Sequence, residues 1–199
     1  MANPHRMMNR LRTSLLQLAC IALLPAATAS SLPQSLQLEP LSTKVEFTLP
    51  SLLHTVHGEF KLKRGSIQLD PATGKASGEL VVDATSGESG SSGRDRRMHK
   101  DILQSDKFPE IVFRPDRVEG KVLPQGASQV QLHGIFSIHG ADHEIFVPLE
   151  VQASEGQYTT IGHFSVPYVK WGMKNPSTLM LRVNDTVEIK IETVAKMVK

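Results

Sequence analysis

Period-two alternation is the feature that most constrains the fold of this chain. Hydrophobic residues recur at every second position in one segment after another, as in Val45, Phe47 and Leu49. This period indicates β-strands with one buried face. Most of the strands that we predict are separated by short turns, and there are eight of them: 44–49, 59–69, 75–82, 110–117, 129–138, 144–152, 158–166 and 182–192.

The short turns constrain how these strands pair. A connection of a few residues can join only antiparallel neighbours, because a parallel pair needs a long crossover. Eight antiparallel strands suit a closed barrel, whose interior is filled by side chains or holds one small ligand. We therefore predict an all-β fold, an eight-stranded antiparallel β-barrel.

One long interruption, residues 83–113, separates the third and fourth of these strands. Its first part, residues 85–93, is rich in Gly and Ser, and we expect it to be mobile. Ser92 and Asp95 have the spacing of a capping box, which predicts a helix at about residues 93–103. Met98 and Ile102 give this helix one narrow apolar stripe, so we expect a surface helix that lies across a barrel mouth as a lid.

The N-terminus has the layout of a secretory signal peptide. Three arginines precede an apolar run at residues 15–24, and an Ala-Thr-Ala sequence ends at Ala29. The run is shorter than the roughly 20 residues of a transmembrane helix, although an uncleaved anchor is the alternative. We expect a signal peptide at 1–29, a polar leader at 30–40 and the barrel domain at 41–195. The mature protein is then periplasmic or secreted, with no transmembrane segment.

Cysteine usage excludes several functions. Cys20 is the only cysteine and lies in the apolar run, where Leu18 and Ala19 would allow a lipoprotein site that Gln17 disfavours. Without the signal peptide no cysteine remains, which excludes a disulfide, a thiol enzyme and a thiolate metal site.

The charge balance argues against nucleic-acid binding. Removing the three arginines of residues 1–29 from the 22 basic residues leaves 19, against 20 acidic ones. A near-neutral chain without a basic stripe gives no electrostatic reason to expect a nucleic-acid partner.

Four segments together identify a family. They are HGEF at 57–60, the stretch from RDR to FPEI at 94–111, GIFSIHG at 134–140 and the closing strand at 185–191. With them the chain resembles the YceI-like family of exported bacterial proteins, also called polyisoprenoid-binding proteins, over about residues 38–191. The resemblance implies a lipocalin-like barrel, crossed by the helix, that holds a long isoprenoid chain in an apolar tunnel. The Gly/Ser-rich residues 86–92 and the segment 169–177 depart from the common pattern of the family.

Inward-facing apolar residues are the candidates for the tunnel wall. An isoprenoid tail needs such a wall because each buried methylene contributes about 0.8 kcal/mol. From the residues alone, an ordinary filled core is the alternative, and the resemblance favours the tunnel. The candidates are Phe47, Phe60, Leu62, Met98, Ile102, Phe113, Phe136, Ile138, Val147, Leu149 and Phe164.

Polar residues near the lid are candidates for the head group of a ligand. Arg94 and Arg97 can pair with a phosphate or quinone oxygen, or else form a solvated helix face. His57 and His99 are the other head-group candidates, and with His54, His139 and His143 they form a group at strand ends, turns and the lid. Imidazole is a common zinc ligand, but no carboxylate or cysteine completes a pattern, so we predict no metal site.

These observations favour a binding protein over an enzyme. No Ser-His-Asp pattern, P-loop or carboxylate pair is evident, and we expect no covalent chemistry and no cofactor besides the isoprenoid lipid. A homodimer is possible. The alternatives are a metal-dependent enzyme that uses the histidine cluster, and a ligand-free structural or stress protein of the cell envelope.

Overall fold

The computed structural model describes residues 33–178 and 182–198. The predicted signal peptide and Cys20 lie outside the described residues. Within the described residues no helix is long and apolar enough to cross a membrane.

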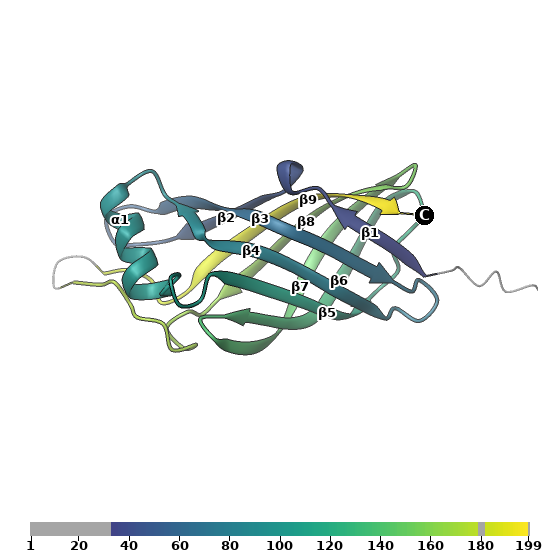
Figure 1. The fold of residues 1–199 in the computed structure, drawn as a ribbon. Helices are drawn as coiled ribbons and strands as arrows, with labels where there is room; N and C mark the ends of the chain where they lie inside the picture. The colour runs from purple at the N-terminus through teal and green to yellow at the C-terminus, as the bar shows by residue number, and fades with distance from the viewer. Residues whose placement is uncertain (1–32, 179–181, 199) are drawn as a thin grey trace, which may run out of the picture.

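In the described residues, nine strands form one antiparallel sheet that closes on itself (Figure 1). β1 and β2 together occupy a single strand position of this barrel. Both pair with β3 and β9, β2 near the helix and β1 at the opposite end, and the 3-10 turn η1 (Pro40–Ser42) separates them. The closed barrel thus has eight strand positions, which confirms the predicted eight-stranded antiparallel β-barrel. The strands are β1 (Gln34–Leu38), β2 (Lys44–Leu49), β3 (Val56–Leu69), β4 (Ala76–Glu88), β5 (Glu110–Glu119), β6 (Gly126–Ile138), β7 (Ala141–Ser154), β8 (Gln157–Val166) and β9 (Val187–Val198).

Several strand boundaries differ from the predicted ones, and two of these differences affect the cavity or the loop beside it. β1 lies within the predicted polar leader, yet Leu36 and Leu38 alternate inward there and Leu38 is buried. β9 begins at Val187 rather than at residue 182, because Asn184 accepts a hydrogen bond from the backbone N–H of Thr186 in a local turn. This turn replaces the strand ladder over those residues.

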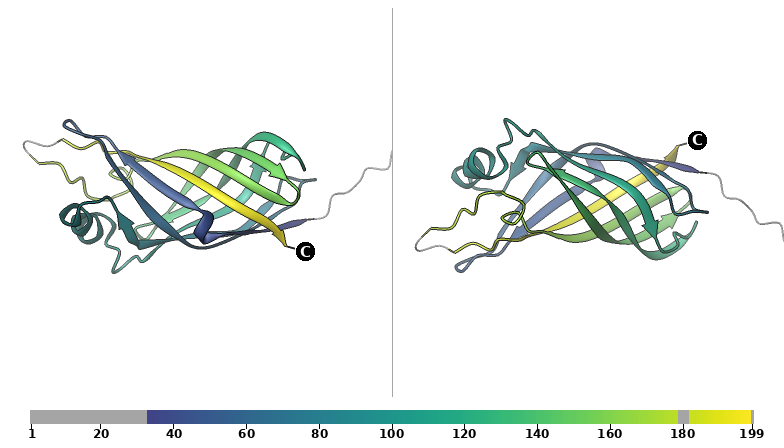
Figure 2. Two further views of the ribbon diagram at one scale, coloured as in Figure 1. Left: turned by 90° about the horizontal axis from the view of Figure 1, so that it is seen from above. Right: turned by 90° about the horizontal axis from the view of Figure 1, so that it is seen from below.

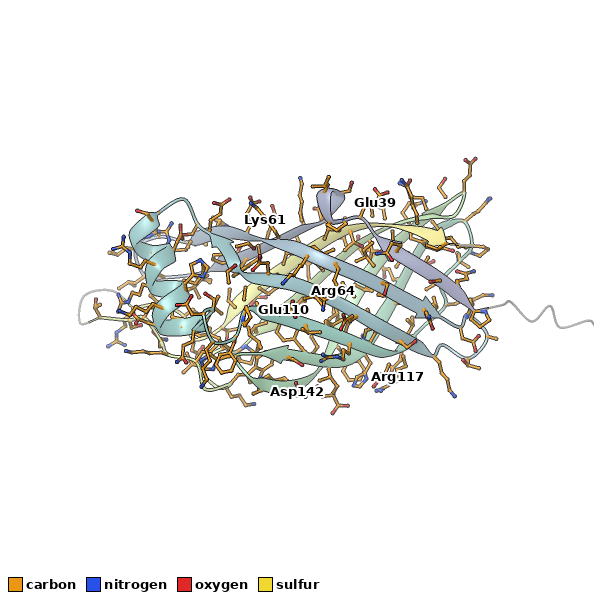
Figure 3. All side chains as sticks on the ribbon, viewed as in Figure 1. Glu39, Lys61, Arg64, Glu110, Arg117 and Asp142 are labelled. Carbon is orange, nitrogen blue, oxygen red and sulfur yellow. The ribbon has the colours of Figure 1, made fainter. Side chains whose placement is uncertain are left out.

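A β-bulge in β3 reverses which residues face inward. The register against β4 shifts between Leu62 and Arg64, directly before Gly65. Lys63 is the additional residue, so Lys63 and Arg64 both point outward and both bond to Glu110, at 2.9 and 3.2 Å. Figure 3 shows Arg64 and Glu110 together on the outer surface. The inward positions change from even to odd numbers across the bulge, which keeps Ile67 on the inner face.

The helical insertion lies at one end of the barrel (Figures 1 and 2). It consists of α1 (Ser92–Arg97), followed by the π-helical turn η2 (Met98–Leu103). The predicted capping box is not formed: Ser91 is the N-cap residue, without a side-chain cap. Asp95 instead accepts hydrogen bonds from the backbone N–H and the hydroxyl of Ser89.

The two ends of the barrel differ in their connections. The helix end comprises the β2–β3 loop, the insertion, the β6–β7 turn and the β8–β9 loop, which the structure describes at residues 167–178 and 182–186. The far end comprises short connections at residues 70–75, 120–125 and 155–156, together with the start of β1. Figure 2 shows the insertion and the β8–β9 loop at the same end, opposite the C-terminus.

Candidate ligand-binding cavity

An apolar cavity of about 260 Å³ occupies the barrel interior. Its wall takes side chains from all nine strands, from η2 and from the β8–β9 loop. In the described part of the chain no charged residue contributes to this wall. Its polar side chains are confined to the hydroxyl-bearing residues Tyr158, Thr160, Tyr168 and Thr193.

The cavity is large enough for an apolar ligand and is long as well as apolar. An engineered apolar cavity of about 150 Å³ in another protein stays dry and binds benzene, and this cavity is larger. β3 has 14 residues, which at about 3.3 Å per residue and a tilt of about 40° extend about 35 Å along the barrel axis. The interior therefore suits an elongated apolar chain better than a compact molecule.

Ten of the eleven predicted tunnel residues lie on this wall. The exception is Leu62, which is buried in the core cluster but does not reach the cavity. Leu62 directly precedes the β3 bulge, where the inward direction of the strand changes. The ten are Phe47, Phe60, Met98, Ile102, Phe113, Phe136, Ile138, Val147, Leu149 and Phe164. Their contact with a ligand stays a prediction.

Some wall residues beyond the predicted candidates lie on predicted strands, such as Val45 and Ile189, and others come from two regions where no strand is predicted. Tyr168 and Met173 reach the cavity from the irregular β8–β9 loop, where no period predicts which side chains turn inward. Leu36 and Leu38 reach it from β1, and their alternation was a usable signal within the predicted leader.

The helical insertion closes one end of the cavity. Met98 and Ile102, the predicted apolar stripe, and the adjacent Leu103 all lie on the cavity wall. His99 fixes the insertion to the barrel: its Nε2 lies 2.8 Å from the Gly87 carbonyl oxygen and its Nδ1 lies 3.1 Å from the Ser105 hydroxyl. Because a carbonyl oxygen only accepts, the Nε2 atom carries a proton that it donates to Gly87.

A second contact fixes the segment that leads into the helix. The Arg94 guanidinium donates to the hydroxyl and to the carbonyl oxygen of Ser89, at 2.7 and 2.6 Å. The expected mobile loop is therefore shorter than predicted, since residues 85–88 belong to β4 and Ser89 is bonded to both Arg94 and Asp95.

None of the four predicted head-group residues is placed on the cavity wall. Arg94 and His99 make the internal bonds described above. His57 is exposed on the outer face of β3, where its Nδ1 lies 3.1 Å from the Thr48 hydroxyl. Arg97 is exposed on α1. Their placement gives no support to a contact with a ligand inside the cavity.

The histidines of the proposed cluster are not brought together as metal ligands. Among the residues that the structure describes, no three His, Cys, Asp or Glu side chains form a group that could hold a metal ion. His139 packs on the ring of Phe108, with ring centroids 4.9 Å apart. His143 stacks on Trp171, with centroids 3.9 Å apart and ring planes within 6° of parallel.

A buried histidine outside the cavity has its own structural role. His133, on β6, is almost completely buried although it faces outward, because the ring of Phe146 covers it at a centroid distance of 4.5 Å. Its Nδ1 lies 2.6 Å from an oxygen of Asp116 and its Nε2 lies 2.8 Å from an oxygen of Glu144. This contact joins β5, β6 and β7 on the outer surface.

The fold is similar to those of several solved structures, among them the following three. Burkholderia cenocepacia BcnA shares 18% identity at a TM-score of 0.66, over 80% of this chain and 99% of that one. A polyisoprenoid binding domain from Saccharophagus degradans, described as implicated in plant cell wall breakdown, shares 14% identity at a TM-score of 0.63, over 82% and 98%. The YceI protein of Campylobacter jejuni shares 18% identity at a TM-score of 0.58, over 74% and 87%.

Comparison with protein families gives the assignment. No curated protein sequence matches the chain. The model of the YceI-like domain matches residues 36–195, which is nearly the whole barrel from β1 to β9. The chain therefore belongs to the family of proteins with a YceI-like domain.

Proposed function

We propose that this protein is an exported carrier that holds an isoprenoid lipid in its barrel cavity. The observation that carries the proposal is the cavity wall, which is apolar along the barrel and closed by the apolar stripe of η2. Each methylene that moves from water into such a wall contributes about 0.8 kcal/mol, so a chain of several isoprene units binds through its length alone. The similarity to a polyisoprenoid binding domain supports the same ligand class.

Export is the second part of the proposal. Residues 1–29 have the charged, apolar and small-residue regions of a signal peptide. A lipid with a long apolar tail needs a carrier wherever it crosses water, and the periplasm is such a compartment. Fractionation of cells that express the full chain, with mass measurement of the purified protein, tests this part. We expect periplasmic protein that lacks residues 1–29, and full-length cytoplasmic protein would contradict export.

The ligand itself is tested by extraction. The protein is purified without detergent from its native host, extracted with organic solvent and examined by mass spectrometry. We expect an isoprenoid lipid at close to one molecule per protein. An empty extract from folded protein would favour a structural role, and stoichiometric zinc or iron in the same sample would contradict a pure carrier.

A pair of variants locates the lipid in the cavity. Leu149 lies on the cavity wall, and Glu150, the next residue of β7, is exposed on the outer face. Leu149→Trp adds bulk inside the barrel and should sharply reduce the co-purified lipid, at a cost in stability of about 1–3 kcal/mol. Glu150→Trp adds the same side chain outside and should leave the lipid unchanged. Equal lipid content in both folded variants would place the ligand elsewhere.

A further inference from the structure

His143 lies on the inward-facing side of β7 at the helix end, although it is not among the residues that line the cavity. In the β6–β7 ladder His143 is directly opposite Phe136, and residues in that relation point to the same face. Phe136 lines the cavity, as does Ile145, two residues further along β7. The neighbouring Asp142 projects from the outer surface in Figure 3, where it accepts a hydrogen bond from Ser137.

The β8–β9 loop holds this imidazole in a fixed orientation. The indole of Trp171 lies parallel to the ring of His143, and the same indole packs on Phe136 with centroids 5.9 Å apart. Trp171 lies between Tyr168 and Met173, both of which reach the cavity. The stack covers one face of the imidazole, so its ring edge is the part left to interact.

The Nε2 atom of His143 is buried and has no hydrogen-bond partner among the described residues. A buried polar atom without a partner costs about 1–3 kcal/mol, and such an atom is normally bonded to protein, water or a ligand. The Nε2 of His139 is also without a partner. That residue follows the inward-facing Ile138 and packs on Phe108, so its ring does not share the inward face.

The charges around the cavity define which head group fits. Burial, opposed by the nearby Asp142 carboxylate, lowers the pKa of the His143 imidazole and so favours its uncharged form. No charged side chain lines the cavity within the described residues. A phosphate or diphosphate would therefore enter without a cation to pair with, which is unfavourable in an apolar interior. A hydroxyl, carbonyl or amide group needs only one hydrogen bond.

We propose that His143, held by Trp171, binds the uncharged oxygen-bearing head of the lipid at the helix end of the cavity. The inference rests on the proposed carrier function and adds to it the head-group class and the orientation of the ligand. The tail then extends from the helix end toward the far end, along the apolar wall. The head remains close to the insertion and the β8–β9 loop.

Three probes with the same farnesyl chain test this subsite: farnesol, farnesyl diphosphate and the hydrocarbon farnesene. Binding to lipid-free protein is measured by calorimetry and by the fluorescence of Trp171, the only tryptophan of the chain. One neutral hydrogen bond contributes enough for a preference of about 5-fold to 10-fold. We expect farnesol to bind more tightly than farnesene by that factor, and more tightly than farnesyl diphosphate.

Variants separate the subsite from the tunnel. His143→Phe keeps a ring on Trp171 and should bind farnesene as the wild type does, with no preference for farnesol. His143→Gln restores a donor and an acceptor and should recover part of the preference. His57→Phe, which changes an outward-facing histidine, should keep the full preference for farnesol over farnesene. If His143→Phe does not fold, the 15N resonances of the His143 ring in wild-type protein give the same answer, and we expect them to shift with farnesol and not with farnesene.

The outcomes distinguish the two proposals. Equal wild-type affinity for farnesol and farnesene would overturn the subsite and leave the carrier function intact, with an ordered water as the partner of Nε2. Tightest binding of the diphosphate would overturn the uncharged head group. No binding of any of the three probes would overturn the carrier function itself.

Discussion

At the far end of the barrel the chain reverses through short connections bonded by the backbone, whereas at the helix end two long segments are held to the barrel partly by side chains. At the far end, the N–H of Gly74 donates to the carbonyl oxygen of Asp70 at 2.8 Å. The N–H of Val118 donates to the carbonyl oxygen of Gly74 at 2.7 Å. At the helix end, His99 bonds the insertion to Gly87, and the Tyr168 hydroxyl donates to the carbonyl oxygen of Asn184 at 2.7 Å.

We take this difference to indicate which end opens. The backbone bonds of the far end continue the strand ladders, so releasing them would unpair the barrel. The side-chain hydrogen bonds of the helix end can be lost while every strand of the barrel stays paired with its neighbours. Local opening generally involves such regions, which have few ladder bonds. We infer that a ligand enters and leaves at the helix end, and the following variants test the contrast.

The largest effect is expected at the far end, at Gly78. This residue of β4 has a φ of 114°, and a Cβ atom there would lie 2.2 Å from the carbonyl oxygen of Ser66. Gly78→Ala should lower the free energy of unfolding by roughly 3 kcal/mol, because backbone strain and a backbone clash combine. Urea unfolding measures the change.

Gly93 at the helix end is the matched control for this substitution. Nothing lies within 4 Å of a Cβ atom built there, and the residue is in α1. Gly93→Ala should be neutral or should stabilise the protein by about 0.5–1 kcal/mol. If both alanine variants have the stability of the wild type, the far end is not the rigid end.

His99 gives the next largest effect, and here ligand exchange should respond as well as stability. His99→Ala removes both bonds of the ring and leaves the hydroxyl of the buried Ser105 without its partner. We expect a loss of about 1–3 kcal/mol and faster release of bound farnesol, measured by stopped-flow fluorescence. Arg97→Ala, an exposed change on the same insertion, should alter stability by less than about 0.5 kcal/mol. An unchanged release rate in a destabilised His99→Ala variant would show that the insertion is not the lid.

The two buried tyrosines compare the ends directly. Tyr168 donates to a backbone carbonyl oxygen at the helix end, whereas Tyr158 donates to the side chain of Gln34 at the far end, at 3.1 Å. Tyr168→Phe should cost about 1 kcal/mol, and Tyr158→Phe should cost less, because the Gln34 side chain can turn toward water. Thermal unfolding of both variants measures the difference, and a larger cost for Tyr158→Phe would reverse the expected order.

The contribution of Tyr168 should also depend on pH. Burial, with a smaller effect of Asp185, raises the pKa of Tyr168 to about 12. Because the folded value lies above the ordinary value of 10.0, the contribution is complete below pH 10 and is lost as the pH rises toward 12. The stability advantage of the wild type over Tyr168→Phe should disappear over that range. A difference that stays constant to pH 12 would contradict this assignment.

The same contrast explains how much of the molecule the sequence predicts. In the barrel wall the alternation is imposed by the pleat, so it indicates the inward residues correctly in β2, β6 and β7. One additional residue interrupts the period at the β3 bulge, where the inward positions change from even to odd numbers and the alternation then resumes at Ile67. The helix end has no such period. Tyr168, Met173 and Trp171 are positioned by tertiary contacts, and no local pattern predicts which of them reach the cavity.

The predicted head-group residues show the same limit. Arg94 and His99 have suitable chemistry, but bonds to Ser89 and Gly87 engage them in holding the insertion. His143 was recognised only as a turn residue of a histidine group. Its inward orientation follows from the extent of β7, which begins at Ala141 rather than at residue 144, so that His143 joins the alternation of Ile145 and Val147 on the inner face.

The smallest effect is expected at Asp70, in the exposed turn between β3 and β4. Its carboxylate accepts hydrogen bonds from the Thr73 hydroxyl at 2.7 Å and from the backbone N–H of Ala72 at 2.9 Å. These bonds, the Thr73 hydroxyl first, lower the pKa of Asp70 below 3.8. A lowered pKa means that the contribution to stability is present above pH 3.8 and is lost as the pH falls through the folded value.

Asp70→Ala should therefore reduce the melting temperature slightly at pH 7, and the difference from the wild type should shrink as the pH falls below 3.8. Asp106→Ala, which removes an exposed carboxylate at the helix end, is the matched control substitution. Since the backbone bonds at Gly74 persist without the carboxylate, the far end should remain closed and farnesol release should keep its wild-type rate. Faster release from Asp70→Ala than from His99→Ala would mean that the far end is the one that opens.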